Sequence, residues 1–95
     1  MDPFQYYRHL RNTRRYVEDH LTEGIRLADV ANEVGLSPAH YSGFFHKATG
    51  VRFSAWLRHQ RIDRAKQLLR ECDQPNYQIA IDVGFRSLSA FERAF

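Results

Sequence analysis

Cysteine is nearly missing from this sequence, and its scarcity excludes several kinds of site. Of the 95 residues only Cys72 is a cysteine, so no internal disulfide can form and no cysteine-based zinc set is available. The five histidines do not supply the His-x-x-x-His spacing of a helical metal site. We therefore predict that the protein holds no metal and needs no cofactor.

Long hydrophobic runs and catalytic motifs are absent as well. The apolar runs cover only a few residues, too short to span a membrane, and "MDPFQYYRHLRN" lacks the apolar stretch of a signal peptide. No Gly-rich phosphate loop occurs, and the hydroxyl and histidine side chains fall at expected helix caps and surfaces. These absences predict a cytoplasmic protein that is not an enzyme.

Positive charge is concentrated in the middle of the chain. The net charge is only +3, but residues 51–70 carry one acid, Asp63, against a group of cations. These cations are Arg52, Arg58, Arg61, Arg64, Lys66 and Arg70. A basic segment favours a polyanionic partner, and a solvated helix face explains the same charges equally well.

Hydrophobic spacing and cap residues predict an all-α chain without strands. Apolar residues recur with helical periodicity, Asp2-Pro3 and Ser37-Pro38 are typical helix starts, and Gly24 is a typical end. Pro75 ends the longest helix. The first expected helix runs from its cap at Asp2 to its stop at Gly24, and the others cover about residues 27–34, 38–50, 53–70, 77–83 and 88–95.

One pattern occurs twice. "VANEVGLSPAHYSGFF" (residues 30–45) matches "IAIDVGFRSLSAFERAF" (residues 79–95), so that Gly35 aligns with Gly84 at an offset of 49 and Ser37 with Ser87 at an offset of 50. Each copy predicts a short helix, a glycine turn with a polar cap, and a second helix, which is a helix-turn-helix unit. In DNA-binding proteins the second helix of such a unit enters the major groove.

The basic segment between the copies predicts how they are joined. A helix of ~17 residues extends ~25 Å, enough to hold two recognition helices about one turn of DNA, ~34 Å, apart. One chain would then do the work of a symmetric dimer. We expect residues 1–51 to form the first unit, residues 52–71 the linker helix and residues 72–95 the second unit.

At this level of detail the chain resembles the DNA-binding domain of bacterial AraC/XylS-family transcription regulators, from about Tyr16 to Phe95. The resemblance rests on "LADVANEVGLSPAHYSGFFHKATG", on "GVRFSAWLRHQRIDRAKQLL" and on "IAIDVGFRSLSAFERAF". It implies two homeodomain-like three-helix units on a shared linker helix. It also implies sequence-specific binding to double-stranded DNA, with the two recognition helices in successive major grooves.

The chain departs from the family pattern at its end. The family signature continues past the last Phe with a basic stretch, a Gly-x-x-Pro turn and a final helix, whereas nothing follows Phe95. Family members usually also carry an effector-binding or oligomerisation domain. The resemblance therefore implies an excised fragment without its effector domain, in which the second unit is incomplete at the C-terminus and is the less stable half.

The resemblance also assigns contact positions in the two recognition helices. In the first helix they are Ala39, Ser42 and Gly43, with His40 and His46 nearby; in the second they are Leu88, Ser89, Glu92 and Arg93. Arg93 is the best single candidate for a base or phosphate contact, and its alternative role is a surface ion pair with Glu92 or Asp82. Gly43 either permits a close approach of the backbone to DNA or reflects a neutral loss of a long side chain.

Cations near the helix ends are expected to clamp phosphates, with solvated charge as the alternative. They are His46, Lys47, Arg52 and Arg86. Arg61 lies among the apolar residues of the linker helix, so we expect it to be structural and paired with an acid such as Asp29 or Asp82.

A second reading of the sequence stays open at this point. Ser42 and Gly43 offer little for base recognition, which fits a helical protein-interaction module that contacts RNA polymerase or another partner and binds DNA weakly or not at all. Salt-dependent DNA binding distinguishes the two, because phosphate contacts weaken steeply with salt.

Overall fold

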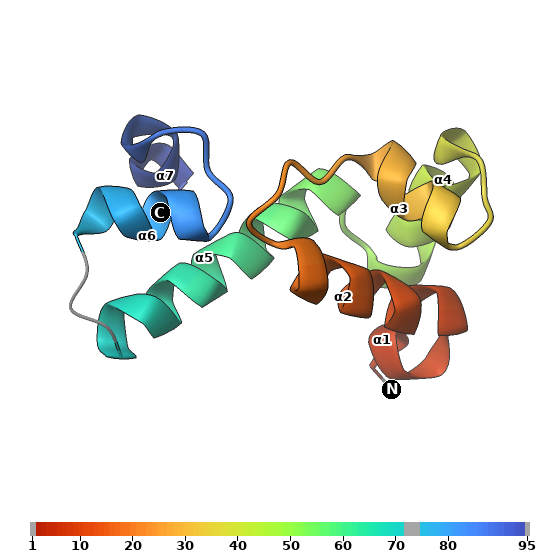
Figure 1. The fold of residues 1–95 in the computed structure, drawn as a ribbon. Coiled ribbons are helices and arrows are strands. Elements are labelled where there is room, and N and C mark those ends of the chain that lie inside the picture. The colour runs from red at the N-terminus through yellow and green to blue at the C-terminus, as the bar shows by residue number, and fades with distance from the viewer. Residues whose placement is uncertain (1, 72–74, 95) are drawn as a thin grey trace. The chain divides into compact units, whose positions relative to one another are not determined.

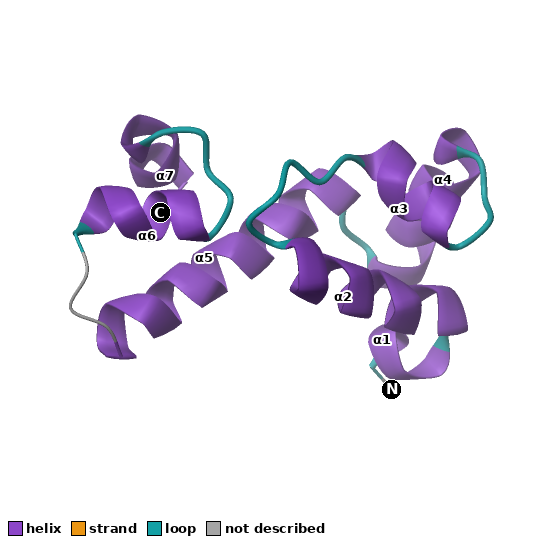
Figure 2. Cartoon of the chain, viewed as in Figure 1, coloured by secondary structure: helices purple, strands orange, loops and turns teal. Residues whose placement is uncertain are grey.

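The computed structural model describes residues 2–71 and 75–94, and that part of the chain is helical, without strands (Figures 1 and 2). Its helices are α1 (Pro3–Tyr6), α2 (Arg8–His20), α3 (Leu27–Glu33), α4 (Pro38–Thr49), α5 (Phe53–Glu71), α6 (Asn76–Asp82) and α7 (Leu88–Ala94). The predicted all-α fold is confirmed. From α3 onward the predicted bounds differ by no more than one residue at either end, and Phe95 lies outside the described residues.

The chain forms two compact units. Unit 1 comprises Met1–His20 and Ile25–Trp56, and unit 2 comprises Leu21–Gly24 and Leu57–Phe95. The division falls inside α5, which begins in unit 1 and continues through Arg61 without a break in unit 2. The short loop 21–24 belongs to unit 2, although the chain on both sides of it belongs to unit 1.

The N-terminal segment is two helices, so the prediction of one helix over residues 2–24 is wrong. The chain is extended at Tyr7 (φ −93°, ψ 126°), between α1 and α2. In a continuous helix Phe4 would lie about 120° around the axis from the buried Leu10, on the solvent side. The break turns Phe4 inward, where its ring stacks on Trp56 with 5.1 Å between the centroids. Burial of this aromatic surface offsets the interrupted helix.

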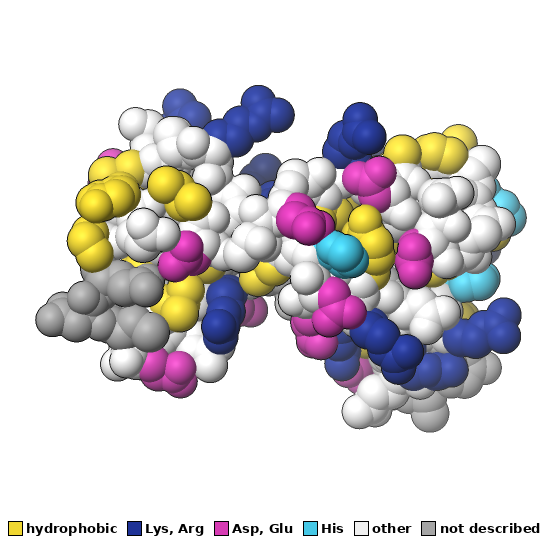
Figure 3. Space-filling view, in the orientation of Figure 1, with side chains coloured by type: hydrophobic (Ala, Val, Ile, Leu, Met, Phe, Trp, Pro, Cys, Tyr) yellow, Lys and Arg dark blue, Asp and Glu magenta, His cyan; other side chains and the backbone are white. Residues whose placement is uncertain are grey.

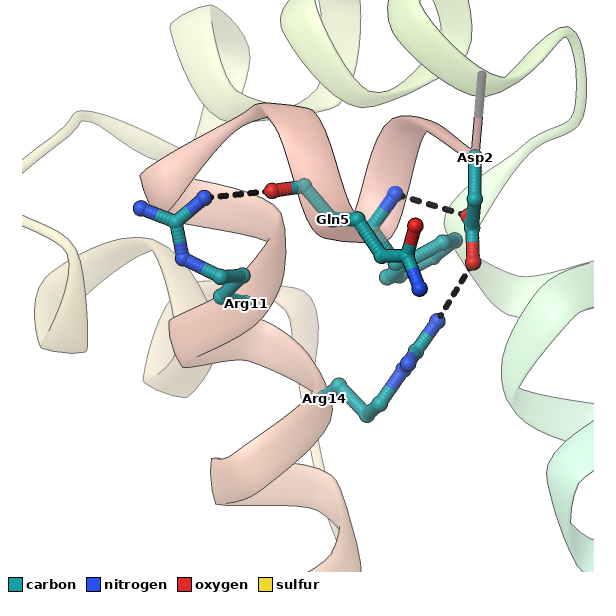
Figure 4. Close-up of polar contacts among 5 residues, drawn as sticks. Asp2, Gln5, Arg11 and Arg14 are labelled. Atoms are coloured by element: carbon teal, nitrogen blue, oxygen red, sulfur yellow. Dashed lines mark hydrogen bonds and ion pairs between the residues drawn. The ribbon is translucent and has the colours of Figure 1, made fainter.

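Polar contacts fasten α1 to α2 (Figure 4). Asp2 caps α1 by accepting the backbone N–H of Phe4 at 2.9 Å, and its other oxygen lies 3.5 Å from Arg14. Arg11 donates to the carbonyl of Gln5 at 2.6 Å, and the Arg14 guanidinium lies 4.8 Å from the centre of the Phe4 ring. These contacts are partly exposed, so each contributes about 1 kcal/mol or less. Figure 3 shows Lys and Arg side chains gathered over the same two helices.

The core of unit 1 is rich in aromatic rings. Tyr41 and Phe45 of α4 are fully buried, and Phe45 meets Phe53 edge to face with 5.5 Å between the centroids. One polar residue lies inside this core. Thr13 of α2 is fully buried, donates to the carbonyl of His9 at 2.8 Å and hydrogen-bonds the Tyr41 hydroxyl. The pair joins α2 to the first half of α4.

The core of unit 2 is largely aliphatic. It consists of Ile62, Ala65, Ile79, Ala80, Val83 and Phe91, with Leu68, Phe85, Leu88 and Ala94 packed against it. The two rings of this cluster, Phe85 and Phe91, meet with 5.5 Å between their centroids. Phe91 of α7 therefore takes the place in unit 2 that Tyr41 of α4 takes in unit 1.

Candidate nucleic-acid interface

The turns of the two repeats are built from the same backbone hydrogen bonds. In the first, Gly35 donates to Asn32 at 3.1 Å and Leu36 to Ala31 at 2.9 Å. In the second, Gly84 donates to Ile81 at 3.0 Å and Phe85 to Ala80 at 2.9 Å. The bond that spans five residues in each copy closes the helix in the manner of a Schellman motif. The sequence repeat is therefore also a repeat of backbone structure.

Glycine is required at the same place in both turns. Gly35 has φ 78° and Gly84 has φ 94°, in the left-handed region that other residues avoid. After each turn a serine caps the next helix: Ser37 accepts the backbone N–H of His40 at 3.2 Å, and Ser87 accepts that of Ala90 at 3.1 Å. Each glycine ends one helix, and each serine starts the helix predicted to recognise DNA.

The second turn is one residue longer than the first, and the additional residue is Arg86. Its side chain is exposed, one position before the cap of α7. Figure 3 shows Lys and Arg side chains projecting from the surface beside α7. If α7 faces DNA as predicted, an exposed arginine at its start is suitably placed for a phosphate.

The outer face of α4 carries most of the positions predicted for the first helix. Tyr41 and Phe45 define its buried side, and the residues on the other side are small or hydrophilic. Ala39, His40, Gly43 and Lys47 are exposed, and Ser42 and His46 are half-buried. Arg52 is exposed in the connection to α5, where its carbonyl accepts the backbone N–H of Trp56 at 3.0 Å.

The outer face of α7 holds three of the four positions predicted for the second helix. Ser89, Glu92 and Arg93 are exposed, on the side away from the buried Phe91. Leu88 is different, because its side chain is half-buried and packs against the core of unit 2. Leu88 therefore contributes to packing, and its place on the contact face stays a prediction.

Four cations predicted to contact DNA have no anionic partner among the described residues. Within residues 2–71 and 75–94, neither Lys47 nor Arg52 of unit 1 forms an ion pair, nor does Arg86 or Arg93 of unit 2. The alternative in which Arg93 pairs with Glu92 or Asp82 does not occur in the structure, and Asp82 accepts from Gln78 at 2.8 Å instead. These four cations are available for an external anion.

Arg61 has a different partner from the acid predicted for it. Its Nη2 donates to the backbone carbonyl of Glu23 at 3.2 Å. Asp29, one of the two expected acids, accepts the backbone N–H of Arg26 at 3.2 Å. The structural role was predicted correctly and the partner was not, because no sequence pattern indicates a carbonyl 38 residues away.

The Thr13–Tyr41 pair supports α4, the first predicted recognition helix, and was missed in the sequence. Burial raises the pKa of the Tyr41 hydroxyl to about 12. Since Thr13 donates to His9, the Tyr41 hydroxyl donates to Thr13. A signal existed: Thr13 shares the spacing of Leu10 and Val17, so a polar side chain falls on the apolar side of α2.

Two kinds of feature are not found in the described part of the chain. No helix there is long and apolar enough to cross a membrane. No three His, Cys, Asp or Glu side chains among those residues come together as metal ligands would.

Known sequences place these features in a family. A sequence model described as a helix-turn-helix domain matches residues 30–95. Regulatory protein PocR of Salmonella typhimurium is 38% identical over 86 residues, which are 90% of this chain and 28% of that protein. The arabinose operon regulatory protein of Escherichia coli is 34% identical over 87 residues, 90% of this chain and 30% of that protein. The chain spans less than a third of the length of these relatives.

Solved structures share the fold. The C-terminal domain of AraT, a response regulator from Geobacillus stearothermophilus, superposes with a TM-score of 0.86 at 28% identity, over 94% of this chain and 74% of that one. The DNA-binding domain of AdpA, a global transcriptional factor solved in complex with a target DNA, gives a TM-score of 0.82 at 26% identity. That match covers 100% of this chain and 80% of the AdpA chain.

Proposed function

Because this chain belongs to the AraC-type family of helix-turn-helix transcription regulators, we propose that it is the part of a bacterial regulator that binds double-stranded DNA in a sequence-specific manner. In this proposal α4 and α7 are the recognition helices and enter successive major grooves. The observation that carries it is the twofold occurrence of one turn, with matching hydrogen bonds, each leading into a helix with an exposed polar face.

Base recognition falls to the exposed centres of the two helices. Arg93 has the geometry to donate two hydrogen bonds to a guanine, and Glu92 can accept from a cytosine amino group. On α4, Ala39 offers a methyl contact to thymine, Ser42 and His40 offer single hydrogen bonds, and Gly43 leaves space for the DNA backbone or a base. The second helix is therefore proposed to read bases with longer side chains than the first.

Phosphate binding falls to the cations at the margins. We assign Lys47, Arg52 and Arg86 to phosphates, and His46 joins them when protonated. Three such contacts give a slope of about −3 for log binding constant against log salt, at about 0.9 per contact. Lys66 of α5 is not assigned to a phosphate and serves as the control. Lys66→Gln should leave this slope unchanged.

The test is a binding titration with DNA selected from a random duplex library. Fluorescence anisotropy at several potassium chloride concentrations should give a slope near −3, and the selected duplex should bind about 10³-fold more tightly than a scrambled one. Salt-independent binding, or equal affinity for scrambled DNA, would count against the proposal. In that event the other reading, a helical module that contacts RNA polymerase or another protein, becomes the better one.

The remaining attributes follow from this role. A protein that acts on bacterial chromosomal DNA works in the cytoplasm, and base and phosphate binding call for no enzymatic step. The relatives are more than three times as long as the matched segment, so we propose that an effector-binding or oligomerisation domain in the parent regulator controls this DNA-binding part.

A further inference from the structure

Arg61 is an unusual residue for the inner side of a helix. It lies on α5 next to the buried Ile62, and burial lowers the pKa of its guanidinium from the ordinary arginine value. Its Nη2 donates to the carbonyl of Glu23, whereas its buried Nε has no hydrogen-bond partner among the described residues. A partly buried cation without an acid is costly, and an apolar side chain would avoid the cost.

The guanidinium lies directly against the second turn. A Cβ atom added to Gly84 would come within 2.7 Å of Arg61 Nε and 3.3 Å of its Cζ, and it would also overlap the carbonyl oxygen of Leu21. Arg61, the loop 21–24 and the turn at Gly84 therefore meet at one point inside unit 2. The corresponding point in unit 1 is open, because a Cβ at Gly35 would meet nothing within 4 Å.

Arginine has two properties that this place uses together. Its flat guanidinium lies where a side chain at Gly84 would project, and its Nη2 donates a hydrogen bond to the loop at Glu23. An aliphatic side chain could supply the packing without the hydrogen bond. A lysine could supply the charge without the flat surface or the fork.

The turn that Arg61 contacts leads directly into α7, because the chain runs from Gly84 to the start of α7 at Leu88 in four residues. We propose that Arg61 is a positioning residue for the second recognition helix: it holds the Gly84 turn and the loop 21–24 in the arrangement that presents α7 to DNA. The proposal rests on the DNA-binding function proposed above. Arg61 itself touches no DNA in it.

The first test compares Arg61→Lys with Arg58→Lys on selected DNA. Both changes keep the charge of α5, and Arg58 is an exposed residue of the same helix and the same unit. The half-site read by α7 is identified as the one whose base preferences relax in Arg93→Ala. Arg61→Lys should bind the intact site about tenfold more weakly, because a hydrogen bond from a charged group is lost. Its preference for the selected base pairs over others should weaken at that half-site only. Arg58→Lys should behave as the wild type.

The pattern across half-sites separates positioning from a general loss of folding. A partly unfolded variant has less active protein and loses affinity at both half-sites in the same proportion, and circular dichroism would reveal it. If Arg61→Lys discriminates at the α7 half-site as well as the wild type does, or loses discrimination at both half-sites equally, the proposal is wrong.

Hydrogen exchange of the free protein provides a second measurement that does not depend on DNA. In Arg61→Lys the amides of residues 21–24 and 84–86 should exchange at least tenfold faster, with those of α4 unchanged. Unchanged protection at residues 84–86 would overturn the proposal even if binding fell. If the wild-type protein selects no DNA at all, the proposed function fails instead, and the exchange data still decide whether Arg61 fixes the turn.

Discussion

Gly35 and Gly84 occupy the same point in two copies of one turn, yet one glycine is open to solvent and the other is covered. Both have positive φ and both donate to the carbonyl three residues earlier. Only Gly84 is packed against a loop and a guanidinium. The repeated residues thus determine the backbone of each turn, whereas the surrounding chain determines how firmly each turn is held.

The two proposed recognition helices, α4 and α7, differ in the same way. Tyr41 and Phe91 match in the repeat, and each is the central buried ring beneath its helix. Tyr41 carries a hydroxyl that is satisfied by Thr13, whereas Phe91 packs in a mainly aliphatic cluster. On the outer faces, Gly43 of the first helix stands where the second has Arg93. The two copies share the turn and the buried ring, and they differ in the contacts beneath each helix and in the side chains on its outer face.

The largest effect is expected from alanine at the two turn glycines. Gly84→Ala should lower the free energy of unfolding by about 2–5 kcal/mol, from left-handed backbone strain together with overlap with Leu21 and Arg61. Gly35→Ala introduces the strain alone, so its loss should be about 1–2 kcal/mol. Urea denaturation followed by circular dichroism measures both. Equal losses would mean that the contact around Gly84 does not stabilise unit 2.

Alkaline pH should distinguish the two cores. In the unfolded chain Tyr41 ionises near pH 10, and in the fold its pKa is about 12, so the fold favours the neutral hydroxyl. The stability that this provides is complete below pH 10 and is lost as pH rises toward 12, by about 1.4 kcal/mol per pH unit. Tyr41→Phe removes this dependence and should flatten the stability curve between pH 10 and 12. If the stability of the wild type and of Tyr41→Phe declined in parallel above pH 10, the raised pKa of Tyr41 would be contradicted.

On DNA, the two units are expected to respond differently to the loss of one cation each. Arg93→Ala should weaken binding by about 1–3 kcal/mol and relax the preference at one base pair of the second half-site. Lys47→Ala should weaken binding to all sequences alike and reduce the magnitude of the salt slope by about one. Anisotropy titrations on duplexes with single base changes measure both effects. Identical profiles for the two variants would refute the assignment of one to a base and the other to a phosphate.

The smallest effect is expected at Gly43, where stability and binding should move in opposite directions. A Cβ at this position meets nothing within 4 Å, so Gly43→Ala should stabilise α4 by about 1 kcal/mol through its higher helix propensity. If the DNA backbone approaches closely here, affinity should fall nevertheless. Thermal denaturation and anisotropy on the same sample give the two values, and a gain in both would show that Gly43 is a neutral loss of side chain.

Local signals made most of the fold predictable from the sequence. Ser37-Pro38, Gly50 and the repeated glycine turns fix helix ends within one residue, because caps and left-handed turns depend on near neighbours. No glycine or proline marks the break at Tyr7 in the sequence. The break is coupled to the stacking of Phe4 on Trp56, a residue far away along the chain. The partner of Arg61 and the inward packing of Leu88 likewise depend on tertiary contacts.

The candidate site was predictable to the level of helix faces. Helical periodicity places Ala39, Gly43 and Lys47 opposite Tyr41, and places Arg93 opposite Phe91, as the structure has them. Which of these side chains contacts a base and which contacts a phosphate stays a prediction, because those roles depend on the surface of the DNA as much as on the protein.

The assignment of loop 21–24 to unit 2 bears on how such regulators can be recombined. A chimaera that joined residues 1–56 of this chain to the second half of another regulator would keep loop 21–24 but replace Gly84 and Arg61, which pack against it. The transplanted half would meet a foreign loop at that point. Successful exchange of specificity therefore requires grafting two separate segments, 21–24 and 57–95. Because these segments are in contact, we also expect substitutions in the loop and in the second turn to be correlated among related proteins.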